Sequence, residues 1–207
     1  DIFAALFVTL TFIFLCYAGT GNRYFILVGV FLGLAVGSKG TAVAAVPGII
    51  LYLLLAKLAS RDGQRKQNAR FPRKALIRIL LTPLIAALVF FVTWPWLWRD
   101  TFSRTIWVLG FHAGHMSSGH TTFYAGKVYT HVPWWATPYI LLVKTPLLAF
   151  VLCVLFLSSL LVRLTAKHRV QYGTINVFSW LAGGILTMSA FPIIIGDHYL
   201  VFLAPAV

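Results

Sequence analysis

The stretch Trp94-Pro95-Trp96-Leu97-Trp98-Arg99-Asp100 follows an apolar run at residues 75–94 and opens a long polar and aromatic segment. Tryptophan favours the boundary between hydrocarbon and water, because its ring is apolar while its N–H requires a hydrogen-bond partner. The stretch is therefore typical of a chain that leaves a bilayer at headgroup level. It predicts that residues 95–137 form an outer loop held close to the membrane surface.

The composition places the whole chain in a membrane class. Sixty per cent of the 207 residues are hydrophobic and only 10% are charged, which lies outside the range of a soluble globular domain. Because a helix needs roughly 20 residues to cross about 30 Å of hydrocarbon, the apolar runs predict an all-α, polytopic transmembrane helix bundle with six to seven spans. The predicted spans are residues 2–18, 24–37, 41–58, 75–94, 138–162, 174–195 and 199 onward.

The positive charges predict the orientation of this single transmembrane domain. The net charge is +13, but the basic residues lie between apolar runs rather than over a soluble face, which argues against a nucleic acid partner. Twelve of the 17 Lys and Arg residues lie at residue 23, within 57–78 and within 163–169, which are alternate connections. The positive-inside rule places the basic loops 59–74 and 163–173 in the cytoplasm, against anionic membrane lipids. The chain is thus predicted to be a multi-pass cell-membrane protein.

Five cations are left at or near the outer surface, and they are Lys39, Arg99, Arg104, Lys127 and Lys144. A charge that orientation does not explain is a candidate for function. Lys39 stands between two apolar runs, and its ammonium suits a phosphate group, although a lysine that snorkels from a span end is the alternative. The three loop cations fit either a donor phosphate or outer-leaflet headgroups.

Four histidines lie in or next to the outer loop. His112 and His115 are one helical turn apart, and His120 and His131 follow them. Because no cysteine or glutamate accompanies them, the spacing is not a strong zinc pattern. A divalent metal site therefore stays open beside an interfacial or hydrogen-bonding role.

The carboxylates limit the acid–base chemistry, since the chain has only Asp1, Asp62, Asp100 and Asp197. Asp62 lies in a predicted cytoplasmic loop, so an outer carboxylate base must be one of the other three or lie outside this sequence. Glycine-rich nucleotide loops and nucleophile elbows are absent, which argues against a soluble nucleotide donor. The pattern favours an anionic lipid whose headgroup carries the reacting unit.

One glycine pattern predicts helix packing. Gly29, Gly33 and Gly37 repeat every fourth residue and place one bare strip on a helix face. Such a strip lets a neighbouring backbone approach closely.

Several short motifs occur in order along nearly the whole sequence. They are Asp1 opening a span, residues 33–40 (GLAVGSKG) with Pro47 downstream, Pro95-Trp96 ending a span, and residues 131–135 (HVPWW), 144–146 (KTP) and 196–200 (GDHYL). In these motifs the chain resembles the protein O-mannosyltransferase and aminoarabinose transferase group, integral-membrane glycosyltransferases of the C-type fold. The resemblance implies a cell-envelope enzyme that transfers a hexose or pentose from a polyprenyl phosphate. The acceptor would be a protein or glycolipid on the extracytoplasmic face.

The resemblance also implies roles for single residues. Asp1 matches a second acidic position of the catalytic site, Lys39 matches the lysine that contacts the lipid phosphate, and His131 matches a histidine that can bind a divalent metal. The principal catalytic carboxylate would lie upstream of Asp1, so we expect the sequence to be an inactive piece of a longer enzyme that continues at both ends. Further candidates for substrate contacts are His112, His115, His120, Trp134, Asp197 and His198. The first three histidines and Asp197 depart from the family pattern and leave the sugar and acceptor open.

The expected reaction is a displacement at the anomeric carbon. An acceptor hydroxyl attacks after losing its proton to a carboxylate, and the phosphate leaves on its lipid. Negative charge grows on the phosphate oxygens, so fixed cations stabilise the transition state more than the ground state. Lys39 is the first choice for this role, with Arg99, Arg104 and Lys127 as helpers. A secondary transporter or lipid flippase for an anionic substrate is the main alternative, and a structural membrane subunit is a third.

Overall fold

The computed structural model describes residues 2–18, 20–61, 73–117, 122–124, 126–130, 133–165 and 171–190. The α-helices are α1 (Ile2–Tyr17), α2 (Asn22–Ser38), α3 (Ala45–Arg61), α4 (Arg73–Thr93), α5 (Thr101–Ser117), α6 (Ala136–Lys144), α7 (Leu147–Thr165) and α8 (Tyr172–Ala190). Two 3₁₀ helices, η1 (Gly40–Ala44) and η2 (Pro95–Trp98), precede α3 and α5. The strands β1 (Thr122–Tyr124) and β2 (Lys127–Tyr129) form a small antiparallel hairpin. The described part is mostly helical, which confirms the all-α prediction.

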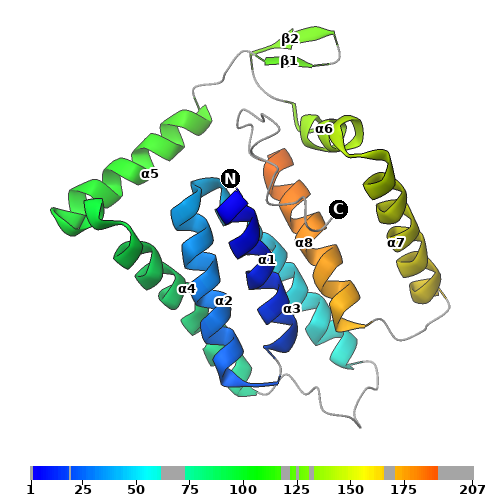
Figure 1. Cartoon of the computed structure of the whole chain (residues 1–207), viewed down its shortest axis with the longest axis horizontal. Helices are drawn as coiled ribbons and strands as arrows, with labels where there is room; N and C mark the ends of the chain where they lie inside the picture. Colours follow the sequence, from blue (N-terminus) through cyan, green and yellow to red (C-terminus); the bar gives the residue numbers. More distant parts are fainter. Residues whose placement is uncertain are drawn as a thin grey trace.

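The helices alternate in direction, so the chain has two distinct ends (Figure 1). The helices α1, α3 and α7 finish, and α2, α4 and α8 begin, at the lower end of the view, which we call the basic end. The α2–α3 junction, η2, α5, the hairpin and α6 lie toward the opposite end, which we call the loop end. This is the alternation that the positions of the basic residues predict.

Helices α2 and α4 pack through the glycine strip, as predicted. The close approaches, measured from a Cβ placed on each glycine, are 2.8 Å from Gly29 to Ile85 Cβ, 2.5 Å from Gly33 to Ala86 O and 3.3 Å from Gly37 to Thr93 Oγ1. Later glycines meet later residues of α4, so the two helices run parallel in this contact. Their carboxyl ends therefore reach the loop end together.

A second close approach joins α3 and α8. A Cβ on Gly183 would collide with the backbone of Gly48, and a Cβ on Gly48 would lie 2.9 Å from the Ser179 carbonyl oxygen. Gly48 and the pair Gly183-Gly184 lie in separate apolar runs and have no helical spacing pattern, and for that reason the sequence did not predict this contact.

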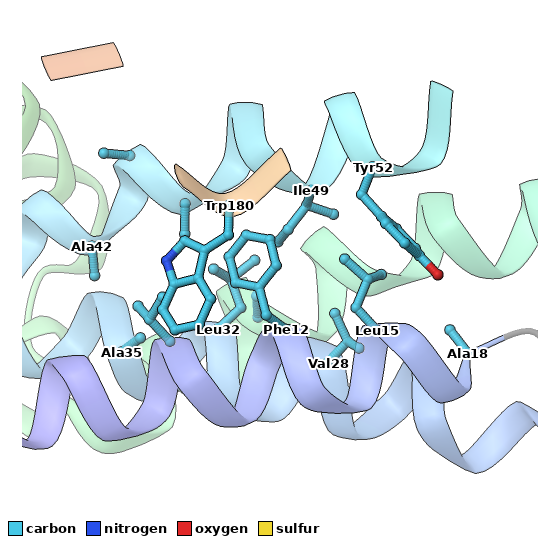
Figure 2. Packing of buried hydrophobic residues seen from close by; sticks show 14 of the residues in the cluster. Phe12, Leu15, Ala18, Val28, Leu32, Ala35, Ala42, Ile49, Tyr52 and Trp180 are labelled. Atoms are coloured by element: carbon cyan, nitrogen blue, oxygen red, sulfur yellow. The ribbon is translucent and has the colours of Figure 1, made fainter. Parts of the chain in front are cut away.

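Helix α1 packs against α2 of the first pair and α8 of the second pair, and it completes the core (Figure 2). Phe12 stacks on Trp180 of α8 with ring centroids 4.9 Å apart and an interplanar angle of 5°. The Asn176 amide donates hydrogen bonds to the Phe12 carbonyl oxygen at 2.6 Å and to Cys16 Sγ at 2.8 Å. On its other side α1 meets α2, where Phe14 stacks on Phe31 at 5.3 Å. Most of the core thus comes from α1, α2, α3 and α8, and η1, α4 and α6 contribute smaller parts.

The predicted single span at residues 138–162 is wrong in one respect, because the chain breaks between α6 and α7. The two helices are bent by 119°. Pro146 lacks a backbone N–H and disfavours helical geometry in the residue before it, and Thr145 is extended, with φ −69° and ψ 128°. Lys144 is consequently the last residue of α6, which lies across the loop end (Figure 1), rather than a residue part-way down a straight span.

Helix length bears on the number of spans. Among the described residues one continuous helix, Gly40–Leu58, is long and apolar enough to cross a membrane, and the bent pair Ala136–Lys144 and Leu147–Val162 adds a second if it counts as one span. Ile2–Tyr17, Asn22–Ser38 and Leu81–Thr93 are apolar but shorter. A 16- or 17-residue helix is about 25 Å long, a mismatch of a few Å that a bilayer accommodates by local thinning. The number of six to seven spans stays a prediction.

Candidate functional site at the loop end

Lys39 forms the junction between α2 and η1. Its backbone is extended, with φ −157° and ψ 118°, so the helix ends at Ser38. The Lys39 N–H donates to the Ala35 carbonyl oxygen at 3.0 Å, and the Lys39 carbonyl oxygen accepts from the Ala42 N–H at 2.9 Å. The side chain is half-buried. Lys39 therefore stands at a fixed turn at the loop end, where the sequence predicts it.

The α2–α4 contact relates Lys39 to the tryptophan turn. Gly37 lies against Thr93, Lys39 is two residues beyond Gly37, and Trp94 directly follows Thr93. Because the helices run parallel there, Lys39 and η2 emerge at the same end of the bundle (Figure 1). Lys39 and the start of the segment that is predicted to be an outer loop therefore lie at the same end of the bundle. That this end faces outward stays a prediction.

The turn η2 folds back onto α4. The Leu97 N–H donates to the Trp94 carbonyl oxygen at 2.9 Å, and Leu97 is buried. The Trp98 indole N–H donates to the Phe91 carbonyl oxygen at 2.9 Å, which occupies one of the last carbonyls of α4. The segment predicted as loop thus begins with an ordered turn.

A chain of aromatic rings links α4, η2 and α5. The ring centroids are 5.0 Å apart for Phe90–Trp94, 6.1 Å for Trp94–Trp96, 5.6 Å for Trp96–Trp107 and 5.5 Å for Trp107–Phe111. From the sequence, the tryptophans of the 94–98 stretch are expected at the membrane interface as single anchors. The contacts that connect these rings into a chain depend on how η2 turns, which the sequence pattern does not show. The contact between Trp107 and Phe111 is the exception, because residues four apart in a helix lie on one face.

Arg104 lies on this chain. Its guanidinium carbon is 4.7 Å from the centroid of the Trp96 ring, and its Nη1 donates to the Trp96 carbonyl oxygen. A planar guanidinium can stack on an aromatic face while its N–H groups bond elsewhere. Arg104 therefore fastens α5 to η2, a positioning role in addition to the predicted phosphate contact.

Arg99 and Asp100 form the corner between η2 and α5. Both side chains are exposed, and Asp100 has a left-handed backbone with φ 54°. Aspartate tolerates this region better than most residues. The Asp100 carbonyl oxygen accepts from the Arg104 N–H at 3.2 Å and starts the helix. Arg99 is thereby presented on the surface of the loop end, as predicted.

The hairpin supplies the next cation. Lys127 is exposed and pairs with Tyr124 across the two strands, and Gly126 adopts φ 79° in the turn. A second aromatic chain joins the hairpin to α6 through Trp135, whose ring lies 5.7 Å from Tyr129 and 5.8 Å from Tyr139. The neighbouring Trp134, a predicted substrate contact, is 72% exposed.

Several predicted residues lie outside the described part of the chain, and they are Asp1, His120, His131, Asp197 and His198. The backbones of His112 and His115 lie in α5, one turn apart as predicted, but their side chains are outside the described atoms. Within the described ranges, no group of three or more His, Cys, Asp or Glu side chains is arranged to hold a metal ion. The catalytic and metal assignments of Asp1 and His131 stay predictions.

The elements at the loop end carry five cations, spread from η2 and α5 on one side to the hairpin and α6 on the other (Figure 1). They are Lys39, Arg99, Arg104, Lys127 and Lys144. This end can offer positive charge and aromatic faces to an anionic ligand. Comparison of the chain with protein-family models, with curated proteins and with solved structures found no match.

Proposed function

We propose that the chain is a polytopic membrane protein. Helix α7 supports this proposal because large apolar side chains are exposed over about half of its circumference, among them Leu148, Val151, Leu152, Val154, Leu155 and Leu161. The opposite side, with Ala149, Cys153, Phe156 and Leu160, is half-buried or buried and equally apolar. A helix that is apolar all round belongs in a protein core or in lipid, and extensive exposed apolar surface is rare on soluble monomers. Lipid, together with further helices, would cover these side chains.

Within that setting the protein is an integral-membrane glycosyltransferase that moves a sugar from a polyprenyl phosphate to an acceptor on the extracytoplasmic face. One observation carries the proposal: the cations that do not belong to the basic connections lie at the loop end. An anionic lipid headgroup is the ligand that such cations can bind at a membrane surface. The order of the motifs, from Lys39 to the Lys144 break, agrees with the family that the sequence resembles.

The described residues would act on the leaving phosphate. The Lys39 ammonium, on a fixed turn, would face the growing charge on the phosphate oxygens, with Arg99 and Lys127 as further cations on the same end. Fixed charges lower the barrier because they need no reorganisation when the bond to the sugar breaks. The acceptor proton would pass to a carboxylate, Asp1 or one in preceding sequence.

The test compares two lysine variants in membranes that contain the protein with the sequence preceding Asp1. Lys39→Met removes a charge at the loop end, whereas Lys57→Met makes the same change near the basic end of α3. Transfer from a radiolabelled polyprenyl-phosphate sugar should fall at least about tenfold in the first variant, or roughly 1.4 kcal/mol, and stay near parental in the second. Equal transfer by both variants at equal expression would refute the role of Lys39.

A transporter or flippase of an anionic lipid is the second candidate, and the break between α6 and α7 is the observation that favours it. Discontinuous helices often form the substrate sites of transporters. The same membranes separate the candidates: a labelled acceptor product supports transfer, whereas movement of intact labelled lipid across the bilayer without product supports transport.

A further inference from the structure

Helix α5 has an unpartnered apolar face. Phe102, Ile106 and Leu109 fall within about 60° of one another at 100° per residue, and they are 78%, 54% and 65% exposed. Among the described elements, α5 packs substantially against η2. In Figure 1 it departs from the other helices and runs obliquely toward the hairpin.

The other side of α5 is anchored. Arg104, Trp107 and Phe111 lie nearly opposite the apolar face, and Arg104 and Trp107 hold the helix to Trp96 of η2. These contacts fix the rotation of α5 about its axis. The direction in which Phe102, Ile106 and Leu109 point is therefore set by the fold.

We propose that α5 lies in the plane of the membrane, with Phe102, Ile106 and Leu109 inserted among the acyl chains just below the outer-leaflet headgroups. This inference rests on the proposed membrane function. An interfacial helix needs an apolar face that enters about 5–10 Å and a polar or basic flank at the headgroups. On α5, Arg104 lies on the side opposite the apolar face, which would be at the headgroups, and Arg99 immediately precedes the helix.

The surroundings of the face favour lipid over protein as its occupant. The tryptophans of η2, directly before α5, are the residue type that anchors a chain at the membrane interface. Three side chains of this size expose only a few hundred Å², whereas a stable protein interface covers about 800 Å² on each partner. No acidic residue lies between residues 101 and 117, so no carboxylate on α5 itself repels lipid phosphates, and Asp100 before the helix is preceded by the cation Arg99.

The test places an environment-sensitive fluorescent amino acid at single positions of the whole protein in nanodiscs. Ile106 reports the proposed inserted face, Ser103 an exposed position on a different side of α5, and Leu152 the outside of α7. Ile106 and Leu152 are equally exposed in the structure, at 54%, which makes them a matched pair. Each variant is titrated with acyl-brominated lipid and with aqueous iodide.

We expect brominated lipid to quench the fluorescence of probes at positions 106 and 152, and iodide to quench neither of them. Iodide should quench the probe at position 103. Lipid quenching at 152 with iodide quenching at both 106 and 103 would overturn the α5 inference and leave the membrane proposal intact. Iodide quenching at all three positions would overturn the membrane proposal itself. Shielding of 106 from both quenchers would show that protein covers the face, which also overturns the inference.

Discussion

Substitution of Gly33 by alanine tests the contact that places Lys39 beside the tryptophan turn. The new Cβ would lie 2.5 Å from the Ala86 carbonyl oxygen and 2.8 Å from Val89 Cβ, so α2 and α4 must separate. Overpacking of this kind costs about 1–3 kcal/mol, and the gain in helix propensity from glycine to alanine offsets at most about 1 kcal/mol. Because one obstacle is helix backbone, which cannot rotate away, we expect a net loss of about 1–2 kcal/mol.

The other glycines provide graded controls. At Gly37 the nearest atom is the Thr93 hydroxyl at 3.3 Å, which can move, so alanine there should cost less than about 1 kcal/mol. At Gly110, in α5, nothing lies within 4 Å of the added Cβ, and alanine should be neutral or stabilise the helix by up to about 1 kcal/mol. The assay is thermal unfolding in detergent, followed by a thiol-reactive dye. A Gly33→Ala protein that melts with or above the Gly110→Ala protein would refute the reasoning.

Three further predictions concern other contacts. Asp100→Gly should melt higher than Asp100→Ala, by the equivalent of about 1 kcal/mol, because glycine adopts φ 54° without strain. Asn176→Ala should destabilise the bundle by about 1 kcal/mol or more and speed the reaction of Cys16 with maleimide, since the amide bonds to α1 are lost; an unchanged rate would contradict this. Arg104→Lys keeps the charge but not the stacking on Trp96, so limited proteolysis should cut near α5 faster; equal cleavage would argue against the anchoring role.

The glycine strip shows what sequence can predict about packing. The spacing of Gly29, Gly33 and Gly37 predicted that a backbone would approach α2, because that conclusion needs only the helical repeat. It could not identify the partner. On α4 the contact uses Ile85, Ala86 and Thr93, which look like ordinary members of an apolar run. The same holds for α3 and α8, where the two glycines are far apart in sequence.

The break between α6 and α7 could be predicted only in part from the sequence. A residue before proline, such as Thr145 before Pro146, often marks a helix boundary. The apolar residues on both sides of it together have the length of one membrane span, however, and this length led to the prediction of a single span. Proline within a helix does not always break it, as Pro83 inside α4 shows. The two cases differ in tertiary surroundings, which the sequence does not reveal.

The candidate site was predicted as a location rather than as a set of contacts. The positive-inside rule predicts Lys39, Arg99 and Lys127 on one face. In the structure, the elements that carry these residues, which are the α2–η1 junction, the η2–α5 corner and β2, lie toward the loop end (Figure 1). The bond from Arg104 to Trp96 spans eight residues and exists only because η2 turns back. No periodic pattern encodes that turn, so the anchoring of α5 was not foreseen.

The spacing of the glycines on α2 also defines how that helix can shift. A displacement of α2 along α4 by four residues, about 6 Å at 1.5 Å per residue, would keep glycine at two of the three contacts and bring Phe25 or Thr41 to the third. Any smaller displacement would press a larger residue into a neighbouring carbonyl or side chain at every contact. The axial position of Lys39 relative to η2 is therefore set by the register of the three glycines against α4.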